Sequence, residues 1–378
     1  MKRLAIILFL LLSLLPHAAC SDGETLYSVN NTEGNPLFTF CGELHEGDEY
    51  IAKDNMLYRI EQVEQHTATA SLLGLEAMPD VSWISTGAAQ AVFSPLSVPA
   101  ASSKTNNPKL IAMYVTHSDE SYIPTDGTES INGQGGIYDV ARQFRDALQA
   151  KGIDVILDES THLPHDSGAY RRSRQTAERL LQKRPDAIID IHRDGIPDES
   201  EYACTIEGEK ASQVRLLVGR SNQNSEVNRE FAKQIKAVAD KKYPGLIKDI
   251  FIGKGNYNQD LSPNAILFEF GTHTLSKERA LESTALMADV VSTTLYGAQT
   301  GSAKSEKNTA PHTSKKEQPE EKGALTGIVW LIIAVIVGVI LFSFAQTGNG
   351  ISMKTKIGRG ISEITGGMLG KKQKNDKN

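Results

Sequence analysis

Short apolar runs alternate with amphipathic segments between residues 108 and 297. Five of these runs are short enough to form one strand each, at residues 111–115, 153–157, 187–191, 214–218 and 265–270. Between them, apolar side chains recur at helical spacing, most clearly at Ile137, Val140, Ala141, Phe144 and Leu148. Gly152 closes this helix, and further helices are predicted over residues 167–183, 225–242 and 276–296. The alternation predicts an α/β fold, with a largely parallel sheet and helices on both faces.

The sequences that flank this part have different patterns. Residues 25–75 hold short segments of β-forming residues separated by turn residues, which predicts a small β-rich domain. Residues 76–107 are rich in alanine, serine, proline and glycine and predict a linker. Residues 298–323 are polar and lack periodicity, which predicts a flexible stalk. The main domain is therefore expected at residues 108–297.

Two segments have the properties of membrane-directed sequences. Lys2 and Arg3 precede a short apolar run, so residues 1–20 are expected to be a signal peptide. Residues 324–345 carry no charge and are long enough to cross about 30 Å of hydrocarbon as a transmembrane helix. Seven lysines and arginines follow within residues 346–378, and the positive-inside rule places this basic tail in the cytoplasm. We expect a single-pass protein of the cell membrane whose main domain is extracytoplasmic.

Composition narrows the class of protein further. The net charge of −6 argues against general nucleic-acid binding. Three cysteines are too few for a disulfide framework. Cleavage of the signal peptide either after Cys20 or, as in a lipoprotein, before it is consistent with the sequence. Cys41 and Cys204 fall in different predicted domains, so we expect two unpaired and mostly buried thiols.

Three predicted strands run into residues that can bind or serve a metal ion. His117 and His192 each follow a strand directly, and Glu269 lies within a third. The carboxyl ends of parallel strands share one edge of a sheet, so these residues could converge. Two imidazoles, a carboxylate and an open position for water form a typical catalytic zinc site. Glu120, three residues beyond His117, could turn back to the same metal, and Asp119 and Asp139 are competing carboxylates.

Other polar residues beside these strand ends have candidate functions. Glu269 lies in a strongly apolar run, where burial would raise its pKa towards the range of a general base; a structural salt bridge is the alternative. Asp190 should share a side of its strand with His192 and could orient that imidazole. Arg193 and Asp194 could hold a substrate carboxylate or form a surface ion pair.

Two loops could complete a cleft around these residues. His162 and His165 could form one wall, although histidines are common in polar loops. The polar segment at residues 256–263 could bind substrate amides, or it could be a turn with local side-chain to backbone bonds.

Six motifs in the same order resemble the stage II sporulation protein P family over about residues 108–297. They are YVTHSDESY at 114–122, SGAYRRSR at 167–174, IDIHRD at 189–194, YPGL at 243–246, YNQDLSP at 257–263 and LFEFG at 267–271. The resemblance implies a zinc-dependent N-acetylmuramoyl-L-alanine amidase-like hydrolase. Such an enzyme cuts peptide stems from the glycan of peptidoglycan, with an added endopeptidase activity on cross-links, during engulfment in endospore formation.

The resemblance also implies residue functions and partners. His117 and His192 would bind Zn2+, Glu269 would be the catalytic carboxylate, and zinc or Arg193 would stabilise the oxyanion. For the third ligand Glu120 is the first choice and Asp139 the second. Implied partners are a lytic transglycosylase, protein D, and a membrane protein, protein M.

The sequence departs from the family pattern in two places, and two other functions remain open. Val115 and Thr116 precede His117 where members often carry an extra histidine, and the predicted membrane anchor is C-terminal rather than N-terminal. One alternative function is a non-catalytic, membrane-anchored scaffold that binds peptidoglycan. The other is a zinc carboxypeptidase that acts on stem peptides.

Overall fold

The computed structural model describes residues 20–86 and 108–297. The predicted signal peptide up to residue 19, the second part of the linker, the stalk, the membrane segment and the basic tail lie outside these residues. Within the described ranges, no helix combines the length and the apolar character that crossing a membrane requires.

Six neighbouring strands form the sheet of the α/β part, in the order β12, β11, β13, β8, β6, β7. Their bounds are β6 Leu110–Tyr114, β7 Asp154–Asp158, β8 Ala187–Asp194, β11 Val214–Gly219, β12 Ile247–Gly253 and β13 Ala265–Thr272. All neighbours run parallel except β11 and β13, which are antiparallel. The prediction of a largely parallel sheet is confirmed here. Strand β12 was not predicted, because the charged residues Lys248 and Asp249 interrupt its apolar run although both are buried.

The N-terminal β-rich segment continues this same sheet. Its strands are β1 Leu26–Asn31, β2 Pro36–Cys41, β3 Glu49–Ile51, β4 Met56–Glu64 and β5 Thr67–Leu75, followed by a short helix, α2, at Trp83–Thr86. They are ordered β2, β1, β5, β4, β3, and β3 pairs antiparallel with β12. The β-rich character of this segment was predicted, whereas its junction with the larger sheet was not: it was expected to be a separate small domain.

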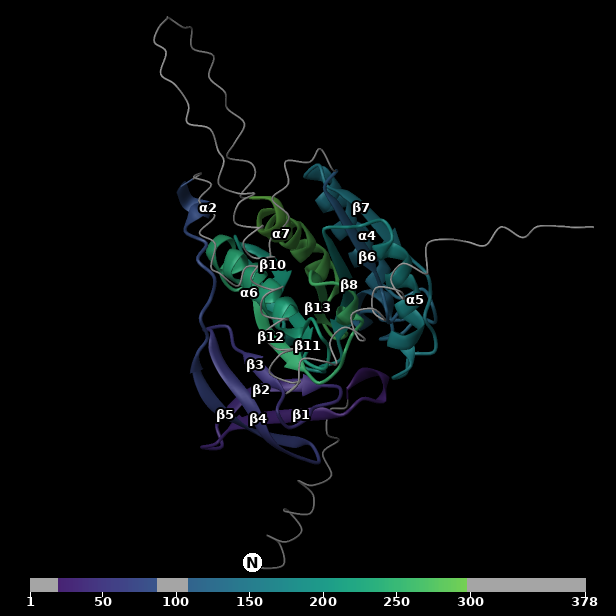
Figure 1. The fold of residues 1–378 in the computed structure, drawn as a ribbon. Coiled ribbons are helices and arrows are strands. Elements are labelled where there is room, and N and C mark those ends of the chain that lie inside the picture. Colours follow the sequence, from purple (N-terminus) through teal and green to yellow (C-terminus); the bar gives the residue numbers. More distant parts are fainter. Residues whose placement is uncertain (1–19, 87–107, 298–378) are drawn as a thin grey trace, which may run out of the picture. The chain divides into compact units, whose positions relative to one another are not determined.

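Helices cover both faces of the α/β part, as predicted (Figure 1). They are α4 Ile137–Ala150, α5 Ala169–Leu181, α6 Ser225–Lys242 and α7 Lys277–Tyr296. The largest apolar core lies between one face and α4, α6 and α7, and it includes Met113, Ile191 and Phe268. On the opposite face, Leu180 of α5 packs in a smaller core with Ile188. Shorter elements are η1 Ser21–Gly23, α3 Ile123–Asp126, η2 Glu199–Glu201, the hairpin β9 Ala203–Ile206 with β10 Glu209–Ser212, and η3 Gln259–Leu261.

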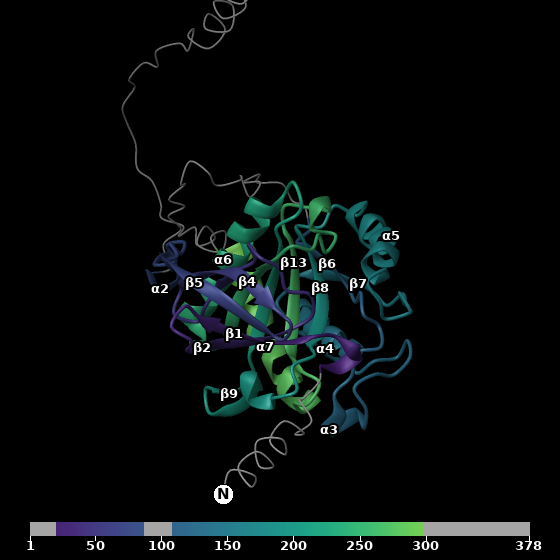
Figure 2. The ribbon, with the colours of Figure 1, turned by 90° about the horizontal axis from the view of Figure 1, so that it is seen from below.

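The N-terminal strands also pack over the face that carries α5. Phe38 and Phe40 of β2 share a core with Leu217, Phe251 and Leu267 from the strands of the α/β part. Figure 2, seen from below, shows the purple strands β1 and β4 lying across the sheet beside β13. This face is therefore covered by α5 at one side and by β1–β5 at the other, with the polar ends of β6, β8 and β13 between them.

The prediction for Cys41 is wrong, because its sulfur is bonded to that of Cys20. Cys204 is a free, partly exposed thiol. Sequence distance could not show the pairing, which forms because residues 20–24 fold back to the end of β2. One backbone contact that fixes this return is the bond from the amide of Ser21 to the carbonyl of Gly195, 3.2 Å long.

The shared core predicts that the N-terminal strands and the α/β part unfold together. The ring of Phe251 is fully buried and stacks on Phe40, with centroids 4.2 Å apart. Phe251→Ala should lower the free energy of unfolding by about 3–5 kcal/mol, since it leaves a cavity between the two parts. Urea denaturation followed by circular dichroism measures this change. Leu75→Ala is the control, because Leu75 is 74% exposed and its loss should have little effect.

Candidate metal centre

The candidate residues project from one face of the sheet at the ends of adjacent strands. His192 of β8 lies opposite Glu269 of β13 in the parallel register. Tyr114, the last residue of β6, lies opposite Asp190 on the other side of β8, so the loop that begins after β6 brings His117 to the same place. Convergence of the three predicted strand ends is therefore present in the structure.

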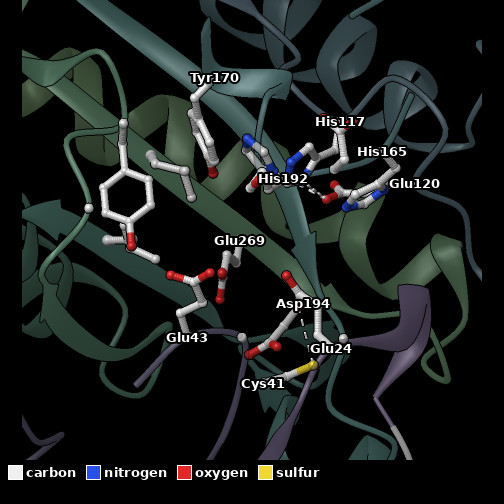
Figure 3. A pocket seen from close by; sticks show the side chains of 18 of the residues that line it. Glu24, Cys41, Glu43, His117, Glu120, His165, Tyr170, His192, Asp194 and Glu269 are labelled. Carbon is white, nitrogen blue, oxygen red and sulfur yellow. Dashed lines mark hydrogen bonds and ion pairs between the residues drawn. The ribbon is translucent and has the colours of Figure 1, made fainter. Parts of the chain in front are cut away.

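Glu120 joins the two histidines into one cluster. Its Oε1 lies 3.0 Å from Nδ1 of His117 and 3.2 Å from Nδ1 of His192. Its Oε2 accepts a hydrogen bond of 2.9 Å from the backbone amide of Arg193. Each of the three side chains offers one ligand atom, and these atoms lie within 4.8 Å of one another. Figure 3 shows the two imidazoles and the carboxylate turned toward one another.

The charges in this cluster depend on one another. Burial by itself would raise the pKa of Glu120, but the charge of His192, hydrogen bonds from both histidines and Arg193 bring it well below its usual value. Burial would likewise lower the pKa of His192, but Asp190 and Glu120 raise it well above the usual value. For His117, burial outweighs the hydrogen bond to Glu120 and lowers the pKa. The cluster therefore favours an ionised Glu120, a neutral His117 and a positively charged His192.

This donor set fits Zn2+. Zinc takes imidazole nitrogen and carboxylate oxygen at about 2.0–2.2 Å, so neighbouring ligand atoms in a tetrahedral site lie about 3.3 Å apart. Two of the separations, 3.0 and 3.2 Å, are close to this value, and all three ligand atoms lie within 4.8 Å of one another. The negative charges of Asp190 and Glu120, which favour a proton on His192, would also favour a metal cation that replaces this proton.

The structure separates the two candidates for the third ligand. Glu120 is 2% exposed and contacts both histidines. Asp139 lies in the first turn of α4 with its side chain about half exposed, where it pairs with Arg142 and Lys277 at 3.2 and 2.7 Å. Of these two carboxylates, Glu120 is the one that lies beside both histidines.

Asp190 lies behind His192, as predicted. Its Oδ1 is 3.1 Å from Nε2 of His192, although the angle is not that of a hydrogen bond. It also accepts bonds of 2.9 and 2.6 Å from the amide and the hydroxyl of Thr116, the residue before His117. Asp190 thus holds the residue before His117 by two hydrogen bonds, whereas the expected hydrogen bond to His192 is not formed.

Glu269 belongs to a second, hydrogen-bonded network beside the metal cluster. The hydroxyl of Tyr202 lies 2.9 Å from Oε2 of Glu269 and 2.6 Å from Oδ2 of Asp194. Arg215 donates to the same Oδ2 of Asp194 at 2.8 Å and lies 3.7 Å from Glu269. Its other side is held by two bonds to Asp249, at 2.8 and 3.1 Å.

This environment favours a proton on Glu269. Burial, followed by the charge of Asp194, raises the pKa of Glu269 well above its usual value, against the opposing effects of Arg215, Tyr202 and His192. Its side chain is 14% exposed, so it remains accessible from the cavity. The expectation of a buried acid with a raised pKa agrees with this geometry.

Arg193 has contacts that the sequence did not predict. Its guanidinium donates to the carbonyls of Ser121 and Glu129, at 3.2 and 2.9 Å, and to the hydroxyl of Ser21 at 2.9 Å. These bonds hold the loop after β6 and the N-terminal segment against β8. The oxyanion function assigned to Arg193 stays a prediction, and the contacts seen are structural.

The two histidines of the loop after β7 have different surroundings. His162 is buried and placed between the carbonyl of Val115, at 2.9 Å, and the hydroxyl of Thr176, at 3.0 Å, so it supports the fold. His165 stacks on His117, with ring centroids 3.9 Å apart, and forms part of the cleft.

The loop at residues 256–263 is also mainly structural. Asn258 donates to the carbonyl of Tyr170 at 3.0 Å, and Gln259 holds β11 through Gly219 and Leu217. Tyr257 lines the cavity beside this loop.

One cavity of about 780 Å³ contains the metal cluster and Glu269. Tyr170 and His165 form the wall beside the histidines (Figure 3). Tyr202 and Arg215, which act on Glu269 from behind, were not identified from the sequence. An arginine inside the apolar run of β11 was a usable signal, since a buried charge needs a partner. Tyr202 gave no comparable signal.

The geometry predicts one zinc site that depends on Glu120. Glu120→Gln should weaken Zn2+ binding by about a hundredfold or more, because the substitution removes a charged ligand. Competition with a chromophoric chelator measures the affinity. Asp139→Asn is the matched control and should bind zinc like the unmodified protein. Equal weakening in both variants would contradict the assignment of the third ligand.

Comparison with known proteins adds the family. The model of the family "Stage II sporulation protein P (SpoIIP)" matches residues 44–292, beginning within the N-terminal β-rich segment. Stage II sporulation protein P of Bacillus subtilis (strain 168) is 30% identical over 214 residues, which are 52% of this chain and 53% of the relative. The chain thus aligns with about half the length of this curated relative.

Solved structures give only a weak likeness. The N-acetylmuramoyl-L-alanine amidase AmiC2 of Nostoc punctiforme is 15% identical, covers 50% of this chain and 95% of its own, and has a TM-score of 0.34. The N-acetylmuramoyl-L-alanine amidase from Clostridium difficile 630 is 14% identical, covers 52% and 100%, and also has a TM-score of 0.34. Scores this low carry no argument. The family match, which extends over more than half of the chain, carries the conclusion: the protein belongs to the stage II sporulation protein P family.

Proposed function

We propose that this protein is a zinc-dependent peptidoglycan hydrolase that cleaves the amide between N-acetylmuramic acid and L-alanine. The observation that carries the proposal is the presence of His117, Glu120, His192 and Glu269 in one cavity. Three potential zinc ligands and a separate acid with a raised pKa are the parts that amide hydrolysis by a zinc enzyme needs. Membership of the family supports the choice of peptidoglycan as substrate.

Each residue of the cavity would have a distinct task. His117, Glu120 and His192 would hold the zinc ion, which when bound supplies a Lewis acid and lowers the pKa of a water molecule. Glu269 would accept a proton from the attacking water as the oxygen–carbon bond forms. It would then return this proton to the amide nitrogen, so that the carbon–nitrogen bond breaks and a neutral amine leaves. Tyr202 would hold the carboxylate of Glu269 in position for both transfers.

The cellular setting follows from the family and from the sequence. We propose action on the septal wall during engulfment in endospore formation, with some cleavage of peptide cross-links as well. The predicted helix at residues 324–345 would anchor the protein in the cell membrane with the cavity outside the cytoplasm. Protein D, a lytic transglycosylase, and protein M, a membrane protein, are the proposed partners.

Loss of the carboxylate of Glu269 should abolish hydrolysis without loss of zinc. Glu269→Gln keeps the shape of the side chain but cannot accept the proton, so the rate should fall about a hundredfold or more. Mass spectrometry of the fragments released from purified sacculi measures both the rate and the bond that is cut. Undiminished release would contradict the catalytic assignment. A protein that binds sacculi without cutting them in any form would be the scaffold alternative, and loss of only terminal residues would indicate a carboxypeptidase.

The hydroxyl of Tyr202 should affect kcat rather than KM. Tyr202→Phe removes only the hydroxyl that holds Glu269, and kcat should fall about tenfold with KM nearly constant. Tyr296→Phe is the matched control: it removes a buried hydroxyl that is hydrogen-bonded 2.7 Å from Asp186. Steady-state kinetics, with melting temperatures for both variants, separates a catalytic effect from a loss of stability. Equal kinetics in the two variants would show that Tyr202 has no positioning function.

A further inference from the structure

The cavity that holds the metal cluster has a second wall, which comes from the N-terminal segment. Residues 23–25, 40–43 and 45 line it, opposite the wall formed by α5 and His165. We call these residues the N-terminal wall. Most of them, including Glu43, precede residue 44, where the family match begins. Membership of the family therefore gives no function for most of this wall.

The N-terminal wall is fixed directly to the catalytic strand β8. In a chain that keeps Cys20, the bond between Cys20 and Cys41 ties the start of the described chain to the end of β2. Ser21 donates its amide to the carbonyl of Gly195, at 3.2 Å, and accepts a bond from Arg193, at 2.9 Å. A Cβ atom at Gly195 would lie 2.6 Å from the sulfur of Cys41, so only glycine permits this approach. Two hydrogen bonds of Ser21 and the close approach of Cys41 to Gly195 thus place the wall next to the residues that follow His192.

The N-terminal wall also makes its side of the cavity negative. Figure 3 shows Glu43 and Glu24 in the part of the cavity that Glu269 enters, away from the histidines. Burial raises the pKa of the nearby Tyr257, and the charges of Asp48, Glu269, Glu43 and Glu24 add to this effect in that order.

Two of the three arginines that line the cavity are engaged by other groups. Arg171 and Arg174 come from α5, and Arg174 is engaged by two bonds of 2.8 Å to Asp260. Arg193 is directed to the oxygens of Ser121, Glu129 and Ser21.

We propose that the N-terminal wall binds the cationic part of the substrate, a free ammonium group on the peptide stem, while the scissile amide lies at the metal cluster. A cavity of about 780 Å³ is far larger than one amide group, so the substrate must extend along it. A stem that extends toward β2 meets Glu43, whose carboxylate complements an ammonium ion. This inference rests on the proposed function and adds a specificity-determining residue to it.

Kinetics with one substrate in two charge states tests the proposal. The probes are soluble muropeptides with free amino groups and the same muropeptides after acetylation of those groups. The unmodified protein should have a lower KM for the free-amino form. Glu43→Gln should raise that KM about fivefold, as for one partly exposed ion pair, with the change falling on KM rather than on kcat. It should not affect the acetylated form.

A matched control and a second measurement make each outcome informative. Glu33→Gln removes an exposed carboxylate from the β1–β2 turn of the same segment, outside the cavity, and should leave both KM values unchanged. An unchanged KM in Glu43→Gln, or the same rise for both probes, would overturn the proposal while leaving the hydrolase function intact. If the unmodified protein cleaved neither probe, the proposed function would fail; calorimetric binding of the two probes to it and to Glu43→Gln would still decide on the wall.

Discussion

The carboxylate of Glu120 is the constraint on which the site depends. It is buried between two imidazoles and a backbone amide, so it links the loop after β6 to β8. A buried carboxylate is costly unless it is hydrogen-bonded and near positive charge, and here every neighbour supplies one or the other. A bound cation would also stabilise the buried carboxylate of Glu120. The same carboxylate would therefore support both metal binding and the local fold.

The packing of the Glu120 loop follows from this constraint. The amide of Ile137, at the start of α4, bonds to the carbonyl of Glu120 at 3.0 Å. At Gly135 a Cβ atom would lie 2.2 Å from that carbonyl oxygen, so the approach of the two backbones requires glycine. Arg193 closes the arrangement from the other side through the carbonyls of Ser121 and Glu129. The ligand is held by backbone contacts around it rather than by its own side-chain rotamer alone.

The mixed sheet explains how one cavity obtains two kinds of wall. Pairing of β3 with β12 carries five N-terminal strands onto the sheet, and the aromatic core around Phe251 packs them over its α5 face. Helix α5 covers the rest of that face, which leaves an opening over the ends of β8 and β13. The histidines lie toward α5, while Glu269 lies toward the N-terminal strands. The candidate metal ligands and the proposed proton acceptor therefore lie in neighbouring but different environments.

The sequence by itself determined the main helices and five of the six large strands of the α/β part, because the spacing of apolar side chains is a local property. It also identified His117, His192 and Glu269, since each interrupts or ends an apolar run at a strand end. Only the tertiary structure decided between Glu120 and Asp139, which differ in burial and not in local pattern. Tyr202, Arg215 and the bond between Cys20 and Cys41 depend on contacts between distant segments, and so does the antiparallel course of β11. Such contacts leave little trace in a single sequence, because a side chain's neighbours across a sheet are set by strand order and register.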